Sequence, residues 1–135
     1  MNDFNASVIA EFRAHGGRVG GPFEGAPLLL LTSTGAKSGE ERTTPVMYLP
    51  DGGRMVIFAS KAGAPTHPAW YHNLVANPTA TVEVGTESFE VDAGVASGEE
   101  RQQLYDRQAE LYPRFADYAE KTTREIPVVV LERRS

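Results

Sequence analysis

The sequence contains no cysteine, which excludes disulfide bonds, thiolate metal ligands and cysteine nucleophiles. It also lacks a long apolar run, because the longest one, at residues 26–31, is far too short to span a bilayer. The first four residues, Met1 to Phe4, have neither the basic nor the apolar region of a signal peptide. We therefore expect a cytoplasmic protein without stable membrane insertion, and peripheral association at the inner membrane face stays open.

Acidic residues outnumber basic ones, 18 to 13, and the formal net charge is −5. Non-specific binding to nucleic acid depends on a basic face that neutralises phosphates, so we expect no nucleic-acid partner. An anionic small molecule remains compatible with this composition, since local cations decide the field inside a cleft.

The length of 135 residues and the hydrophobic fraction of 41% indicate a single globular domain over residues 1–135. Residues 5–15 are predicted to form a helix, because Phe4, Val8 and Phe12 recur at helical spacing and Gly16-Gly17 ends the pattern. We favour a helix that docks on the core over a mobile arm, since few basic residues flank it. A flexible, glycine-rich connection follows to residue 25.

Short apolar or alternating segments joined by turn signals predict about six strands. We expect them at residues 27–33, 42–49, 55–60, 79–84, 87–96 and 126–132, with helices at 68–76 and from 98 to about 111. Ser97-Gly98-Glu99-Glu100 is interpreted as a capping box, and Pro113 interrupts the helix that it opens. Hairpin connections imply antiparallel pairing, so the predicted fold is mainly β with inserted helices (α+β), arranged as a closed or half-closed antiparallel barrel.

Two stretches, residues 34–45 and 59–74, hold most of the scarce chemistry of the chain. They contain two of the three lysines, Lys37 and Lys61, the single tryptophan, Trp70, and several glycines that let backbone N–H groups approach a ligand. The combination favours a site for an anionic ligand with a flat ring over solvated surface lysines beside structural turns.

Other motif interpretations fail on detail. The segment Gly35-Ala36-Lys37-Ser38 lacks the second glycine and the following helix of a P-loop. A hydroxyl–lysine pair at Thr34 and Lys37 needs a helical turn, which the glycines around it disfavour. His67 and His72 lack both the helical spacing and the third ligand of a zinc site, so we expect no metal.

Three aromatic residues near the C-terminus, Tyr112, Phe115 and Tyr118, recur every third residue. Such a stripe is typical of a helix facing the core. It also suits the wall of an aromatic pocket, because a tyrosine hydroxyl needs a partner that a pure core does not offer.

Together, residues 34–45, 59–74 and 112–130 resemble the deazaflavin-dependent nitroreductases, and the resemblance covers nearly the whole chain. It implies a split β-barrel of the FMN-binding, pyridoxamine-phosphate-oxidase-like type. It also implies that the chain binds reduced coenzyme F420, a deazaflavin with a phosphate and an oligoglutamate tail. The enzyme would transfer a hydride to a small electron-poor acceptor, namely a quinone, an enone or a nitroaromatic compound. A membrane quinone is included among these acceptors.

The resemblance assigns expected roles to individual residues. Lys37, Arg42, Lys61 and the Gly63–Ala64 backbone would hold the phosphate and tail, and Ser60, Tyr112 and Tyr118 would donate hydrogen bonds to the acceptor. Met47 and Phe115 depart from positions that are often tyrosine in the family and would shape the substrate pocket. The complete set expected at the cofactor is Lys37, Ser38, Arg42, Thr44, Pro45, Val46, Ala59, Ser60, Lys61, Ala62, Gly63, Ala64, Pro65, Pro68, Trp70, Tyr71 and Asn73.

Two alternatives stay open on the sequence alone. One is an FMN-dependent reductase built on the same barrel. The other is a non-catalytic module that binds a cofactor or haem, which needs the anion motif but no polar pocket beside the ring. A nicotinamide dinucleotide site lacks its usual basis, because no GxGxxG follows a strand.

Overall fold

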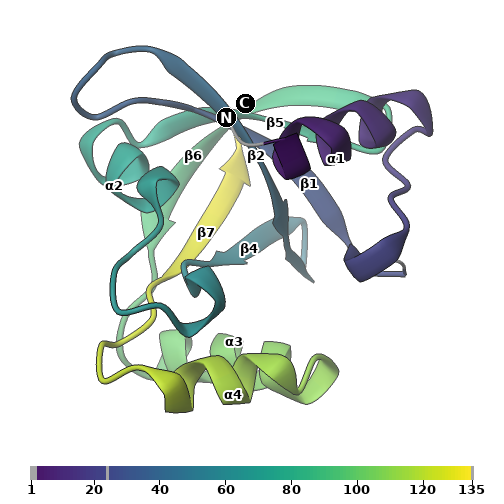
Figure 1. Cartoon of the computed structure of the whole chain (residues 1–135). Helices are drawn as coiled ribbons and strands as arrows, with labels where there is room; N and C mark the ends of the chain where they lie inside the picture. Colours follow the sequence, from purple (N-terminus) through teal and green to yellow (C-terminus); the bar gives the residue numbers. More distant parts are fainter. Residues whose placement is uncertain (1–2, 24, 135) are drawn as a thin grey trace.

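Seven strands form one antiparallel sheet in the order β2-β1-β5-β6-β7-β4-β3, in a computed structural model that describes residues 3–23 and 25–134. The strands are β1 (Leu28–Thr34), β2 (Glu41–Met47), β3 (Leu49–Asp51), β4 (Arg54–Phe58), β5 (Thr79–Val84), β6 (Glu87–Val95) and β7 (Val128–Arg133). The helices are α1 (Asp3–Ala14), α2 (Ala69–Ala76), α3 (Gly98–Leu111) and α4 (Arg114–Lys121), with 3-10 turns η1 (Gly21–Phe23) and η2 (Lys61–Gly63). Helix α1 lies across one end of the sheet, and α3 and α4 lie together below it (Figure 1).

The sheet is curled because its two edge strands are neighbours in the sequence. Strands β2 and β3 lie at opposite edges, yet only Tyr48 separates them. The two edges must therefore approach each other, which bends the sheet into a half-open barrel. The prediction of one continuous strand over residues 42–49 is wrong. The chain passes from one edge of the sheet to the other at Tyr48, and the alternating residue pattern does not mark that change.

Two tight hairpins set the register of the predicted antiparallel pairs. Strands β3 and β4 meet through Gly52-Gly53, whose φ angles of 53° and 89° suit the primed turns of two-residue hairpins. Strands β5 and β6 meet through Gly85-Thr86, with Val84 opposite Glu87. The expected hairpins are therefore confirmed.

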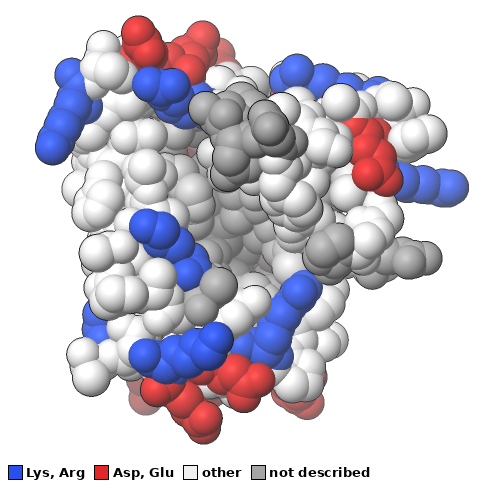
Figure 2. Space-filling model, viewed as in Figure 1, with Lys and Arg blue, Asp and Glu red and all other residues white. Residues whose placement is uncertain are grey.

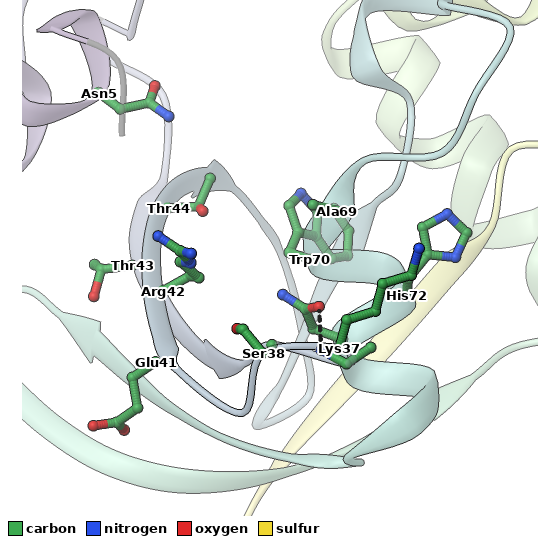
Figure 3. Close-up of a pocket in the computed structure, with 13 residues that line it drawn as sticks. Asn5, Lys37, Ser38, Glu41, Arg42, Thr43, Thr44, Ala69, Trp70 and His72 are labelled. Atoms are coloured by element: carbon green, nitrogen blue, oxygen red, sulfur yellow. Dashed lines mark hydrogen bonds between the residues drawn. The ribbon is translucent and has the colours of Figure 1, made fainter.

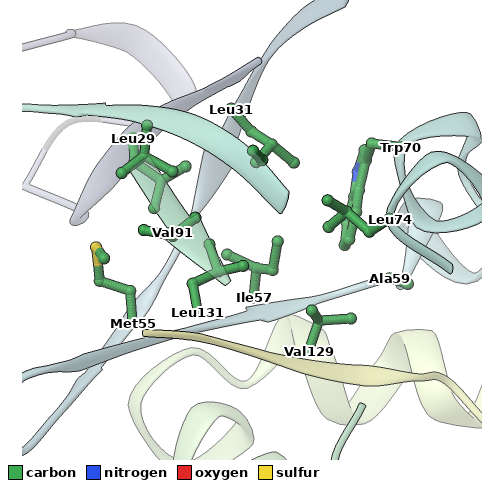
Figure 4. Close-up of a cluster of buried hydrophobic side chains, with 12 residues drawn as sticks. Leu29, Leu31, Met55, Ile57, Ala59, Trp70, Leu74, Val91, Val129 and Leu131 are labelled. Atoms are coloured by element: carbon green, nitrogen blue, oxygen red, sulfur yellow. The ribbon is translucent and has the colours of Figure 1, made fainter. Parts of the chain in front are cut away.

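Strand β1 is apolar on both faces because it contacts two separate cores. Leu29 and Leu31 pack inside the curl with Ile57, Val82 and Leu131 (Figure 4). Leu28 and Leu30 face the other way and pack against Val8, Ile9 and Phe12 of α1. Helix α1 thus docks on the sheet, as the core-docking interpretation predicts.

A third hydrophobic cluster lies between the sheet and helices α3 and α4. Phe58 contacts the rings of Tyr105 and Phe115, each with its centroid 5.8 Å away. The Tyr105 hydroxyl donates to the Phe115 backbone oxygen at 2.6 Å, which fixes α4 against α3. The predicted capping box is wrong: Ser97 precedes α3, but its side chain makes no capping hydrogen bond and Gly98 has a positive φ of 59°.

Candidate functional site

Two neighbouring cavities lie between β2, α1, α2 and α4, and they share a wall. The loop cavity, of about 600 Å³, is lined by residues 35–38 and 41–44 together with α2. The α4 cavity, of about 730 Å³, is lined by residues 44–47 and 60–61, the start of α2 and the first part of α4. Asn5, Thr44, Ala69 and Trp70 line both cavities, so we treat the two as one groove.

The β1–β2 loop forms one end of the groove, and Asn73 of α2 holds it in place. The Ala36 N–H donates to Asn73 Oδ1 at 3.0 Å (Figure 3). Asn73 Nδ2 donates to Ser33 Oγ at 3.3 Å. The loop closes on itself through Gly35 N–H, which donates to the Glu40 oxygen at 2.7 Å. A buried amide that uses both its donor and its acceptor fixes the loop position, so Asn73 braces the cleft.

Two cations lie at the loop end. Lys37 is exposed, and Arg42 points into the space between β2 and α2 (Figure 3). Arg42 Nη2 lies 3.2 Å from Glu40 Oε2, but both side chains are well exposed and such surface pairs contribute little. The charge of Arg42 therefore stays available to an anionic ligand.

The second predicted stretch forms a tight turn at the other side of the groove. Gly63 N–H donates to the Ser60 oxygen at 2.9 Å and Ala64 N–H to the Lys61 oxygen at 3.0 Å, so these amides are engaged within the turn. Gly63 has a φ of 81°, and a Cβ there would lie 2.9 Å from Lys121 Cβ. The turn thus packs so closely on α4 that it requires glycine.

Lys61 adopts a left-handed backbone conformation that is unusual for a side chain of its size. Its φ is 46°, and it is the one described non-glycine residue with a positive φ. Its Nζ donates to Thr66 Oγ1 at 3.2 Å, while the side chain is exposed and lines the α4 cavity. Such conformations cost free energy and cluster at functional sites, and the anion role of Lys61 stays a prediction.

Arg124 fixes the segment from Ser60 to His67, and the sequence analysis did not identify this arginine as a site residue. Its guanidinium donates to the backbone oxygens of Ser60 at 2.8 Å and Ala64 at 2.9 Å, and to His67 Nδ1 at 2.8 Å. Arginine only donates, so His67 accepts through Nδ1 and is neutral. Burial, reinforced by the nearby charges of Arg124 and His72, lowers the pKa of His67 from its usual value.

The N-terminus of α2 opens on the groove. Its N-cap residue, Pro68, offers no side-chain hydrogen bond, so the first-turn amides are not capped by a side chain. The Tyr71 N–H donates to the Pro68 backbone oxygen at 3.1 Å, and the positive end of the helix dipole favours an anion at this point. Trp70, 8% exposed, lies in the same turn and contributes to the wall common to both cavities.

The structure brings most of the predicted site residues to the groove. Those that line it are Lys37, Ser38, Arg42, Thr44, Pro45, Val46, Met47, Ser60, Lys61, Pro68, Trp70, Asn73, Phe115 and Tyr118. The basic residues surround a hollow on this face, and most acidic ones lie toward its outer edge (Figure 2).

Several predicted residues are placed elsewhere in the described part of the chain. Ala59 is fully buried in the core inside the curl, and Tyr71 packs on the ring of His67 with centroids 4.8 Å apart. Tyr112 lines neither cavity and packs instead against the cluster that contains Phe58. Gly63, Ala64 and Pro65 belong to the turn beneath Lys61, and the Ala62 side chain lies outside the described part of the structure.

Metal and membrane features are not found among the described residues. These residues contain no group of three or more His, Asp or Glu placed to hold a metal ion. No described helix combines the length and apolar character needed to cross a membrane.

Comparison with known proteins identifies relatives along almost the whole chain. A family model described as F420H(2)-dependent quinone reductase matches residues 6–133. An F420H(2)-dependent quinone reductase of Mycobacterium tuberculosis is 42% identical over 131 residues, which cover 93% of this chain and 87% of the relative. A solved F420-H2 dependent reductase, FDR-A, has a TM-score of 0.72 and 43% identity, covering 78% of this chain and 94% of that one.

More distant structures share only the fold. A structure from Listeria innocua assigned as a pyridoxamine 5′-phosphate oxidase has a TM-score of 0.57 at 10% identity, covering 98% of this chain and 95% of that one. The haem storage protein HutZ of Vibrio cholerae has a TM-score of 0.63 at 15% identity, covering 94% and 88%. The predicted split barrel is confirmed, and the likeness to HutZ carries no argument for haem.

Proposed function

This chain belongs to the F420H(2)-dependent quinone reductase family, and from that premise we propose that it is an oxidoreductase that transfers a hydride from reduced coenzyme F420 to a quinone. The observation that carries the proposal is the shared wall of the two cavities. This wall connects the loop cavity, which contains Lys37 and Arg42, with the α4 cavity, which is lined by aromatic side chains. Such a continuous groove suits an elongated cofactor that has an anionic tail and a flat ring.

The residues present fit this cofactor. Lys37 and Arg42, with the uncapped start of α2, would bind its anionic tail at the loop end. Lys61, which lines the α4 cavity together with Pro68, would share the phosphate and tail with these residues, and its Nζ has only the weakly competing Thr66 hydroxyl as a partner among the described residues. Thr44 and Trp70, common to both cavities, would then border the ring.

The α4 cavity would receive the acceptor. When bound, the reduced deazaflavin supplies the hydride, and the protein orients the ring and acceptor and excludes water. Ser60 and Tyr118 line this cavity and would donate hydrogen bonds to the acceptor oxygen. Tyr112, also predicted to donate, does not line this cavity, and its ring centre lies 6.0 Å from the Arg114 guanidinium.

The family description specifies a quinone, while reduction of enones and nitroaromatic compounds stays a prediction. A membrane quinone would require peripheral contact with the inner membrane face. Co-flotation of the protein with quinone-loaded vesicles, compared with quinone-free vesicles, would detect that contact.

The test is anaerobic turnover with each electron donor offered separately. We expect rapid enzyme-dependent loss of reduced F420 with menadione as acceptor, and little loss of NADH, NADPH or reduced FMN beyond the rate measured without enzyme. Turnover with reduced FMN or NADPH and none with reduced F420 would overturn the proposal and favour another reductase class.

A further inference from the structure

Arg114, to which the sequence analysis assigned no role, lies at the acceptor end of the groove. It is the first residue of α4, it is half-buried, and it lines the α4 cavity beside Met47, Phe115 and Tyr118. No Asp or Glu is among the described residues that line this cavity. Apart from Lys61, Arg114 is therefore the only positive charge on the described wall.

The partners of Arg114 leave its charge uncompensated. Its Nη2 donates to Met47 Sδ at 3.0 Å, and its guanidinium lies 6.0 Å from the centre of the Tyr112 ring. A thioether is a weak acceptor and a ring compensates little charge. No described carboxylate lies within 4.0 Å of Arg114. Arg54 and Arg107, in contrast, both pair with the carboxylate of Asp51.

We propose that Arg114 binds the acceptor oxygen that becomes negatively charged during reduction. This inference rests on the proposed function and specifies the substrate contact of the same site. Hydride addition reduces a quinone by two electrons and leaves a hydroquinone monoanion, whose charged oxygen then takes a proton from water. The guanidinium retains further N–H donors after its contact with Met47, and their planar arrangement suits such an oxygen.

Arg114 suits this role better than the neutral donors nearby. Ser60 and Tyr118 can each donate one hydroxyl hydrogen to an acceptor, and the Tyr118 ring is held against Phe115 with centroids 5.2 Å apart. A charge-assisted hydrogen bond is roughly twice as strong as a neutral one. The charged oxygen would therefore bind Arg114, and the hydroxyl groups would fix the orientation of the ring.

Equilibrium binding, independent of turnover, tests the proposal. The probes are the anion of 2-hydroxy-1,4-naphthoquinone at pH 7.5, which mimics a quinone with one charged oxygen, and neutral menadione, which has a methyl group at the same position. Quenching of Trp70 reports binding, because this single tryptophan lines the groove. We expect the full-length chain to bind the anion several-fold more tightly than menadione.

Substitution of Arg114 should remove that preference. We expect Arg114→Met to weaken binding of the anion at least about tenfold and of menadione less than about twofold, as loss of one charge-assisted hydrogen bond predicts. Arg114→Lys should retain part of the preference. The matched control Arg107→Met, which removes an exposed arginine outside the groove, should leave both affinities unchanged.

Three outcomes would refute the proposal: no binding of the anion to the wild-type chain, equal affinity of the wild-type chain for both probes, or unchanged preference in Arg114→Met. If Arg114→Met fails to fold, Arg114→Gln takes its place, because it also removes the charge while keeping a polar side chain; its preference for the anion should fall in the same way, and an unchanged preference would refute the proposal. Titration with F420 is the independent check, because Arg114→Met should bind the cofactor normally. Failure of the wild-type chain to bind F420 would instead refute the proposed function.

Discussion

Replacing Arg124 with methionine tests whether one side chain holds the Lys61 turn in its binding conformation. The change removes three hydrogen bonds, to the backbone oxygens of Ser60 and Ala64 and to His67 Nδ1, while keeping much of the apolar volume. Hydrogen bonds to a charged group each contribute roughly 1.5–3 kcal/mol. Water can replace the arginine at the half-buried Ala64 and His67, so we expect a net loss of about 2–4 kcal/mol in the free energy of unfolding.

Urea unfolding measures this loss, and titration with F420 measures its consequence. For an m-value of about 2 kcal/mol/M, the unfolding midpoint should fall by roughly 1–2 M. F420 affinity should also fall, because binding must then order the turn that presents Lys61. Arg124→Lys should be intermediate, since one ammonium group cannot reach all three acceptors in the same fork geometry.

Arg107→Met is the matched control, because it removes an exposed arginine whose ion pair with Asp51 is expected to contribute at most about 1 kcal/mol. A loss in Arg124→Met no larger than that of this control would refute the reasoning. Normal F420 affinity in a clearly destabilised Arg124→Met would show that Arg124 supports the fold without organising the cofactor site.

Three further predictions concern single positions. Lys61→Ala should weaken F420 binding at least several-fold, and more at low salt, because it removes an exposed charge from the groove; unchanged affinity in a titration would contradict its assignment. Tyr118→Ala should alter turnover and acceptor preference in steady-state assays while F420 affinity stays nearly intact, and abolished F420 binding would place Tyr118 at the cofactor instead. Because the pKa of His67 is lowered in the folded chain, His67 binds a proton more readily in the unfolded chain. The contribution of His67 to stability is therefore complete above about pH 6.5, and it is lost as the pH falls toward the folded-state pKa. His67→Asn, whose side-chain oxygen can still accept from Arg124, should reduce the difference between unfolding free energies at pH 8 and pH 5.5, and an unchanged difference would assign that pH dependence to other groups.

Local patterns in the sequence determined most of the elements and much of the ligand chemistry. Hairpin turns such as Gly52-Gly53 specify antiparallel pairing through their own backbone preferences, and apolar periodicity specifies which segments are buried. The scarcity of lysine made Lys37 and Lys61 conspicuous before any geometry was known. Each of these signals lies within a few consecutive residues, so a single sequence is enough to read it.

Only the tertiary structure decided how these pieces meet. The change of sheet edge at Tyr48 leaves the residue pattern unbroken, and it alone curls the sheet so that β2 faces α2 across the groove. Arg124 contacts residues 57 to 64 positions away, and Arg114 contacts Met47 67 positions away, so neither has a local signature. Such contacts depend on the closure of long chain segments around a common core, and short-range propensity carries no information about that closure.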